Sequence, residues 1–241
     1  MMDQLKSWLP RKPASADSLT PQDRQESFAL ALRNYPAHVP PHRGLGASLS
    51  IEQAQQNLDW LNRTLHERLA ALRSLCAQTG WELGDNVINS LEDALDLTAR
   101  LIDWTRASWP THPYLPQHND DAYWAQSERV GPDAIFSVVL DLATLLGQTI
   151  MQGRSEWRWG LDLAPSSLGS QTMLSARRVV LMSPLLGAQR RALVKDLEAL
   201  VLARYRTPND LRFRCPLQFD SWIEYARDGY TGREIDFFKV G

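Results

Sequence analysis

The chain has 241 residues, of which 44% are hydrophobic and 22% are charged, and its formal net charge is −2. This composition is ordinary for a globular protein and excludes the disordered and fibrous classes. A net charge so close to zero also argues against a protein that attracts nucleic acid or an anionic membrane through a general positive field.

The charge is unevenly distributed along the chain. The net charge is +2 over residues 1–50, −7 over residues 51–128 and +3 over residues 129–241, so the middle third is acidic. Cys76 and Cys215 are the only cysteines. They are too few for a disulfide-stapled secreted domain, and their spacing does not suit structural zinc. The N-terminus lacks the apolar stretch of a secretory signal. We therefore expect a cytoplasmic protein.

The first segment predicts a tail, a helix and an irregular connection. Residues 1–19 combine prolines with small polar residues, which is typical of a mobile tail. Thr20-Pro21 then supplies a cap and a proline at the first helical position, and this helix should end at Pro36. Several prolines and glycines follow up to Ser50. Within them, PHRGLG lacks the preceding strand and the Lys-Ser/Thr ending of a phosphate loop, so we interpret it as a tight turn.

Two longer helices follow and should form an antiparallel hairpin. Ser50 and Gln53 make a capping box, and the helix behind them should end at Thr79-Gly80. Ser90 begins the next helix, which Pro110 ends. Steps of three and four place one apolar stripe on the first helix. Its members are Ile51, Ala54, Leu58, Leu61, Leu65, Leu69, Leu72 and Cys76.

The second half predicts a buried helix and a small sheet. Residues 135–151 are apolar almost all round, yet this run contains Asp141 and is shorter than the roughly 20 residues of a membrane span. Alternating apolar residues over 157–163 predict a strand, with Trp157 and Trp159 in the core. Residues 177–182 read as its partner strand, and 188–205 as a helix.

These elements predict an α+β fold that is mainly helical. An N-terminal helical hairpin would accompany a small antiparallel sheet packed on a buried central helix. By its sequence pattern, the chain can be divided into a helical part (20–128) and a mixed helix and strand part (129–241). Because no linker-like composition divides them, we expect one continuous body.

The histidines do not predict a metal site. The five are His38, His42, His66, His112 and His118. The first two have the i, i+4 spacing of ligands on one helical face, but the prolines between them exclude a helix. His112 and His118, followed by Asp120-Asp121, lie in a proline-rich segment that favours a flexible loop. His66 lies beside an apolar stripe and should be a surface or boundary residue. We expect neither a metal nor another cofactor.

The central helix carries one narrow polar stripe, formed by Ser137, Asp141, Thr144 and Gln148. A carboxylate on so apolar a helix must be hydrogen-bonded, paired or near solvent, because an isolated buried charge is very costly. Asp141, Thr144 and Gln148 could line a ligand pocket. We favour the simpler interpretation of a satisfied structural carboxylate.

Candidate partner-binding residues come from the acidic third of the chain. Acidic residues on the helix that begins after Ser90 would form a charged face, and aromatic residues beside proline-rich loops would be exposed next to it. Such a surface suits the occlusion of a cationic catalytic cleft on another protein, although a solvated face is the default. The residues are Glu92, Asp93, Asp96, Asp103, Trp109, Tyr123 and Trp124.

Two segments carry a resemblance to a known group. NSLEDALDLTARLIDW (Asn89–Trp104) resembles a helix of spaced leucines ending in Asp-Trp, and LLGQTIMQGRSEWRW (Leu145–Trp159) resembles a helix-to-strand unit. Both patterns are similar to bacterial immunity-type proteins and uncharacterised DUF proteins. Gln148 replaces the usual glutamate of that pattern, and Ser155-Glu156 replaces its glycine pair. The resemblance implies a cytoplasmic bacterial α+β protein encoded near secreted toxins.

We therefore expect a non-enzymatic binding protein, most concretely an immunity protein that occludes the active site of a cognate toxin, such as a type VI secretion effector. No catalytic residue, nucleic-acid partner or membrane insertion is expected. An enzyme with a pocket at the central helix, or a secretion-system adaptor, are the alternatives.

Overall fold

The computed structural model describes residues 20–83, 88–109, 114–163, 174–186, 191–207, 226–227 and 230. The expected tail over 1–19 and Cys215 lie outside these residues. The helices are α1 (Pro21–Arg33), α2 (Ile51–Gln78), α3 (Leu91–Ser108), α4 (Asp121–Gln126), α5 (Ile135–Gly153) and α6 (Leu197–Arg206), with short 3₁₀ turns η2 (Gly46–Ser48), η4 (Pro116–Asn119) and η5 (Gly131–Ala134). The strands are β1 (Arg158–Leu161), β2 (Val179–Leu186) and β3 (Arg191–Lys195). The mainly helical α+β class is confirmed.

The helix starts follow the capping signals in the sequence. Thr20 and Ser50 both form capping boxes, in which the hydroxyl accepts from the N3 backbone amide and the N3 side chain returns to the cap. Ser90 accepts from the Asp93 amide in front of α3. These bonds satisfy amides that a helix leaves free in its first turn. Local chemistry therefore positions the starts of all three helices.

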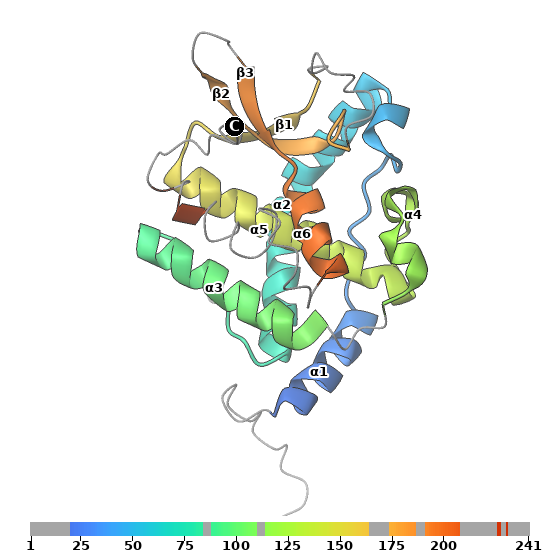
Figure 1. Cartoon of the computed structure of the whole chain (residues 1–241), viewed down its shortest axis with the longest axis vertical. Helices are drawn as coiled ribbons and strands as arrows, with labels where there is room; N and C mark the ends of the chain where they lie inside the picture. The colour runs from blue at the N-terminus through green and yellow to red at the C-terminus, as the bar shows by residue number, and fades with distance from the viewer. Residues whose placement is uncertain are drawn as a thin grey trace, which may run out of the picture.

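Helix α5 is the centre of the fold and contacts α2, α3 and α6. In Figure 1 the sheet lies at one end of the molecule, α1 lies at the other, and α5 runs between them. The buried hydrophobic cluster contains residues from both the 20–128 and the 129–241 parts, for example Leu72 and Leu142. By length and composition, Gly131–Gly153 could cross a membrane, but 78% of its most apolar window is buried inside the structure. Core packing is a sufficient reason for its composition.

Helices α2 and α3 are both present, but the expected antiparallel hairpin is wrong: the two helices cross rather than pack side by side (Figure 1), and α1 packs against each of them. Trp104 of α3 donates its indole N–H to the hydroxyl of Thr79, just past the end of α2, over 2.8 Å. Trp104 also lies edge-on to Phe28 of α1, with ring centroids 5.7 Å apart. These contacts tie the three N-terminal helices together at one point.

Within the described residues the sheet has three antiparallel strands in the order β1-β2-β3. The expected helix over 188–205 is wrong at its N-terminal end, because Arg191–Lys195 forms β3 and α6 begins only at Leu197. The cause is tertiary: β3 hydrogen-bonds to β2 in register Leu181↔Lys195 and Met182↔Val194. Asp196 then caps α6 by accepting from the Ala199 amide.

Candidate functional site

A cavity of about 60 Å³ opens between α2, the 40–49 connection, α5, β1 and β2. Because one water occupies about 30 Å³ in the liquid, this space suits a molecule of a few heavy atoms. Two indoles and several aliphatic side chains form most of the wall, and charged groups close one side. The lining residues are Pro40, His42, Gly44, Leu49, Asn57, Trp60, Leu61, Ala125, Arg129, Leu140, Ala143, Trp159, Arg178, Val179 and Glu198.

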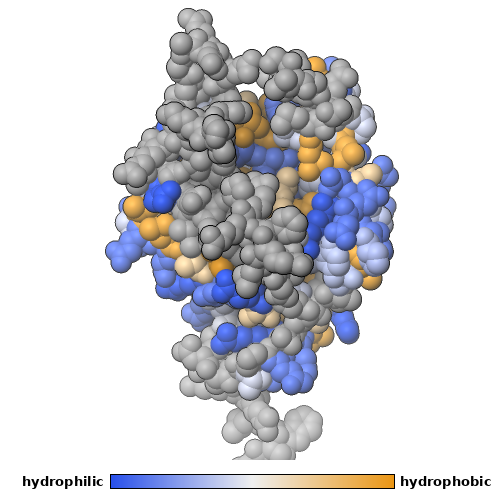
Figure 2. All heavy atoms as spheres, viewed as in Figure 1, coloured by the Kyte–Doolittle hydropathy of each residue, from blue (hydrophilic) through white to orange (hydrophobic). Residues whose placement is uncertain are grey.

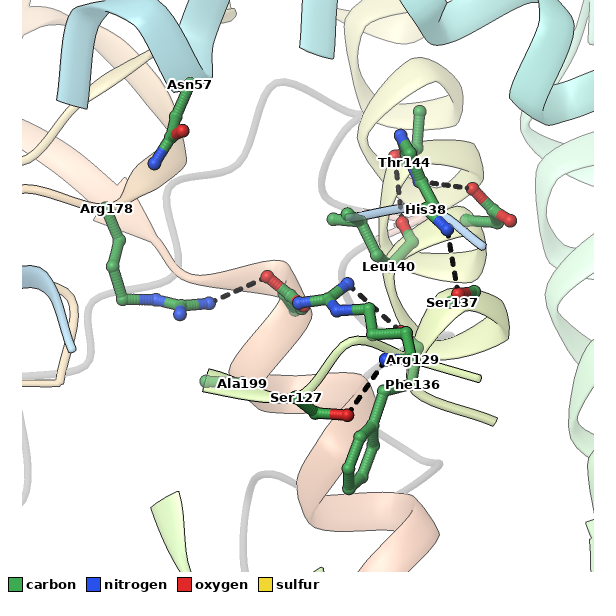
Figure 3. Close-up of polar contacts among 12 residues, drawn as sticks. His38, Asn57, Ser127, Arg129, Phe136, Ser137, Leu140, Thr144, Arg178 and Ala199 are labelled. Atoms are coloured by element: carbon green, nitrogen blue, oxygen red, sulfur yellow. Dashed lines mark hydrogen bonds and ion pairs between the residues drawn. The ribbon is translucent and has the colours of Figure 1, made fainter. Parts of the chain in front are cut away.

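The charged side of the cavity is a network of two arginines and two carboxylates. Arg129 and Arg178 extend towards each other (Figure 3), and each donates to Glu198, over 2.8 Å and 2.9 Å respectively. Arg178 also donates to Asp196 through Nε over 2.9 Å, and its guanidinium lies 4.3 Å from the ring centroid of Trp124. The two arginines lower the pKa of Glu198 against the effect of burial. Glu198 is therefore held as a carboxylate.

Arg129 of this network and Arg177, which precedes Arg178 in the sequence, have an unusual backbone. Arg129 and Arg177 both have φ of 56°, and they are the non-glycine residues with positive φ in the part of the chain that is described. Side chains disfavour this left-handed region, so the surrounding contacts must hold it. Arg129 donates its amide to Ser127 Oγ over 2.9 Å, and its Nη1 donates to the carbonyl of Phe136 over 3.2 Å (Figure 3).

The two indole walls are fixed from behind. Trp159 of β1 packs on Gly147 of α5, where a Cβ atom would come within 2.6 Å of Cη2 of the ring. Glycine at position 147 is thus what lets the strand approach the helix. Trp60 lies against the ring of His38, with centroids 4.5 Å apart. The remaining wall is the 40–49 connection. The His42 backbone amide donates to Asn57 Oδ1 over 3.0 Å, and Asn57 Nδ2 donates to the His42 carbonyl over 2.9 Å, so these two bonds hold the connection against α2.

Behind Trp60 lies a second buried network, centred on Asp141. Its carboxylate is fully buried and accepts from Arg68 through Nε at 3.1 Å and Nη2 at 2.5 Å. Tyr35 donates its hydroxyl over 2.5 Å, and His38 Nδ1 lies 2.7 Å from the other oxygen. His38 also donates its backbone amide to Ser137 Oγ over 2.9 Å (Figure 3).

Burial and partners set the ionisation of this network. Burial disfavours the Asp141 carboxylate, but His38 and Arg68 outweigh it and lower the pKa of Asp141. Burial lowers the pKa of His38 despite the nearby carboxylate, so the ring is neutral at pH 7. Burial and Asp141 raise the pKa of Tyr35 well above its usual value. Asp141 and Arg68 thus form an ion pair with neutral hydrogen-bonding neighbours.

The structural interpretation of the polar stripe agrees with these contacts. Asp141 and Thr144 are fully buried, Thr144 donates to the Leu140 carbonyl over 2.8 Å, and Gln148 is half-buried. None of the three lines the cavity described above. On α5 the cavity is lined instead by Leu140 and Ala143.

His118 is not in a flexible loop, as the sequence suggested, but is fully buried in η4. Its Nδ1 lies 2.9 Å from the Tyr205 hydroxyl and its Nε2 lies 3.0 Å from Asp133 Oδ1. The two aspartates that follow His118 in the sequence have other contacts: Asp120 caps α4, and Asp121 forms an ion pair with Arg206 over 2.5 Å. The described residues contain no group of three or more His, Cys, Asp or Glu side chains that could hold a metal. His66 is exposed, as expected, and His112 lies outside the described residues.

The acidic face of α3 is exposed as predicted. Glu92, Asp96 and Asp103 share one side of the helix at steps of four and seven, and all three are exposed. Asp96 pairs with Arg100 over 2.7 Å, and Asp103 with Arg106 over 3.4 Å. In the view of Figure 2, hydrophilic residues gather where Figure 1 places α3, beside a patch of hydrophobic residues.

The neighbouring aspartate and aromatic residues differ from expectation. Asp93 is exposed but accepts the Asn89 amide over 3.0 Å, a bond that lowers its pKa and helps to begin α3. Trp109 and Trp124 were predicted at the surface, which is wrong: they are 2% and 0% exposed. Trp109 packs edge-on against Tyr205, and Trp124 lies under the Arg178 guanidinium.

Tyr123 is half-buried, and its hydroxyl donates to Asp133 over 2.8 Å. Among the described residues near the C-terminal end of α3, Tyr114 is an exposed aromatic residue, with 39% of its surface accessible. Its ring lies 5.5 Å from that of Tyr205, which in turn contacts Trp109 at the helix end. Tyr114 therefore takes the place that the sequence assigned to the tryptophans.

Comparison with protein-family models, with curated proteins and with solved structures found no match for this chain. The residues that sequence reasoning missed are Arg68, Arg129, Arg178 and Glu198. One signal was available in the sequence. Arg68 lies on the apolar stripe of α2, and Asp141 lies on the apolar face of α5. Because an isolated buried charge is very costly, two single opposite charges on buried faces are expected to pair. Arg129, Arg178 and Glu198 carry no comparable signal, because they come from separate elements that only the fold unites.

Proposed function

We propose that this protein is a non-enzymatic binding protein, most concretely an immunity protein that neutralises a cognate secreted toxin such as a type VI effector. The observation that carries the proposal is the row of exposed carboxylates on α3, Glu92, Asp96 and Asp103, with the exposed ring of Tyr114 near one end of the helix. A partner of matching chemistry presents a cationic cleft. Acidic groups steer such a partner, and an aromatic ring supplies contact area.

The state of the buried carboxylates also supports binding over catalysis. The enzymatic alternative gave Asp141 a role in a pocket, but Asp141 is fully buried and paired with Arg68. A general acid or base must reach its substrate and be poised near the working pH. The lowered pKa of Asp141 and that of Glu198 point to structural anions.

The test is copurification of the tagged protein with the product of the neighbouring gene, and protection of cells that express that product. The double variant Asp96→Lys plus Asp103→Lys should abolish protection, because it reverses charge on the proposed contact face. Asp93 is left unchanged because it begins the helix.

A matched control makes the same change of charge elsewhere. Asp59 and Glu67 are exposed on α2, so Asp59→Lys plus Glu67→Lys should retain protection and partner binding. Circular dichroism melting of both double variants checks that the fold survives. If no protein encoded at the locus binds the wild-type chain, or if both double variants lose binding equally, the proposal fails.

A further inference from the structure

We infer that the cavity between α2, α5 and the sheet is a binding site for a free, compact and uncharged aliphatic molecule of about three carbons. The inference is independent of the proposed toxin partner. It depends on the engagement of the polar groups in the cavity wall, on their charge balance, and on the shape of the apolar remainder.

The first argument concerns the uncharged polar groups of the wall. Asn57 uses its amide oxygen and nitrogen for the backbone of His42, over 3.0 and 2.9 Å, and the His42 ring bonds to Gln56. The indole Nε1 of Trp159 is buried within the protein, out of reach of a molecule in the cavity. These groups are therefore engaged or sealed off. An aliphatic surface leaves their bonds intact, whereas a polar ligand would give up its own hydration without gaining new partners from them.

The second argument concerns charge. Glu198 accepts from Arg129 on one oxygen and from Arg178 on the other, and Arg178 also donates to Asp196. Two cations thus face two anions, with contacts of 2.8 to 2.9 Å. A charged ligand would place an unbalanced charge beside this network and would lose its own hydration. An uncharged ligand avoids both penalties.

The third argument is the size and shape of the apolar wall. Trp159 is held against Gly147, so this indole needs no rearrangement when a ligand arrives. An engineered apolar cavity of about 150 Å³ binds the six carbons of benzene, so the volume of about 60 Å³ found here suits roughly three carbons. Aliphatic side chains from α2, α5 and β2 would contact them, namely Leu61, Leu140, Ala143 and Val179.

The fourth argument favours a free molecule over the side chain of a partner. The 40–49 connection forms one wall and is bonded on both sides. His42 bonds to Asn57 of α2, and the Gly44 amide donates to the Ala125 carbonyl of α4 over 2.9 Å. A ligand attached to a second polypeptide backbone would have to displace this connection, whereas a molecule of a few atoms would not.

The experiment is an NMR titration of the full chain with cyclopropane and, separately, with acetamide and acetate as polar molecules of similar size. The reporters are the methyl groups of Leu61 and Val179. The methyl groups of Leu72, which is buried and does not line the cavity, are the internal control. Cyclopropane should shift both reporters in a saturable titration. Because each buried CH₂ group adds only about fourfold to an affinity, the titration should lie in the millimolar range. Acetamide and acetate should produce no saturable shift.

Matched variants test the position and the size of the site. Leu140→Ala removes three carbons from the wall and should bind benzene about tenfold more tightly than the wild type does. Leu142→Ala is the control, because Leu142 is buried on the same helix but does not line the cavity. Ala143→Val adds two carbons to the wall and should weaken cyclopropane binding about tenfold, because it takes up space that the ligand needs. Circular dichroism checks that each variant folds.

A titration with N-acetylleucine amide distinguishes a free ligand from a side chain that is attached to a backbone. It should leave the Leu61 and Val179 methyl signals unchanged. The inference is overturned if cyclopropane produces no saturable shift, or if acetamide, acetate or N-acetylleucine amide binds as tightly as cyclopropane. It is also overturned if Leu142→Ala gains benzene binding at the reporters as Leu140→Ala does.

Discussion

Replacing Asp141 by asparagine should be among the most destabilising conservative changes in this protein. The side chain keeps its shape, but the carboxylate that accepts from Arg68 and Tyr35 is lost, and Arg68, itself 3% exposed, keeps its charge. Removing one partner of a buried ion pair costs about 3–5 kcal/mol. A domain of ordinary stability has only about 5–15 kcal/mol in total.

The measurement is urea unfolding followed by tryptophan fluorescence and circular dichroism. With a slope of roughly 3 kcal/mol per molar urea, the midpoint of Asp141→Asn should fall by about 1–2 M. Asp59→Asn is the matched control, because Asp59 is exposed on α2 and accepts only from Gln55 in the described structure. Its change should stay within about 0.5 kcal/mol.

A double-mutant cycle separates the charge from the packing. Asp141→Leu plus Arg68→Met removes both charges, so its loss of stability should be smaller than that of Asp141→Asn alone. A residual cost of about 1–3 kcal/mol should remain, because Tyr35 loses its acceptor. The reasoning is refuted if Asp141→Asn lowers the free energy of unfolding by less than about 1 kcal/mol. It is also refuted if the double variant is less stable than Asp141→Leu alone or Arg68→Met alone.

Three further predictions follow from the same contacts. Burial lowers the pKa of His38 in the folded state below its unfolded value of about 6.5. The unfolded chain therefore binds a proton more readily, so the free energy of unfolding should hold its full value above that pH and decrease as the pH falls below it. The free energies of unfolding at pH 7 and pH 5 should differ less in His38→Gln than in the wild type. Gly147→Ala should destabilise by about 1–3 kcal/mol in thermal or urea unfolding, since the added methyl meets the Trp159 ring; a gain, as helix propensity alone predicts, would contradict the packing. Trp104→Phe should cost about 1 kcal/mol or slightly more through loss of the bond to Thr79, and an unchanged melting temperature would contradict it.

Sequence alone determined the local features of this protein. Thr20, Ser50 and Ser90 begin three helices because a cap needs only a side-chain oxygen and the amides that follow it. The apolar run of α5 predicted a buried helix, and the single Asp141 within it required a partner wherever the helix was buried.

Tertiary structure decided what those features contact. Residues 191–195 have a pattern that continues into α6, yet they form a strand because β2 supplies the pairing. Trp109 and Trp124 flank loops and still lie in the interior, since Tyr205 and Arg178 cover them. The cavity is the clearest case: its lining residues come from elements far apart in the sequence, and no local pattern specifies their convergence.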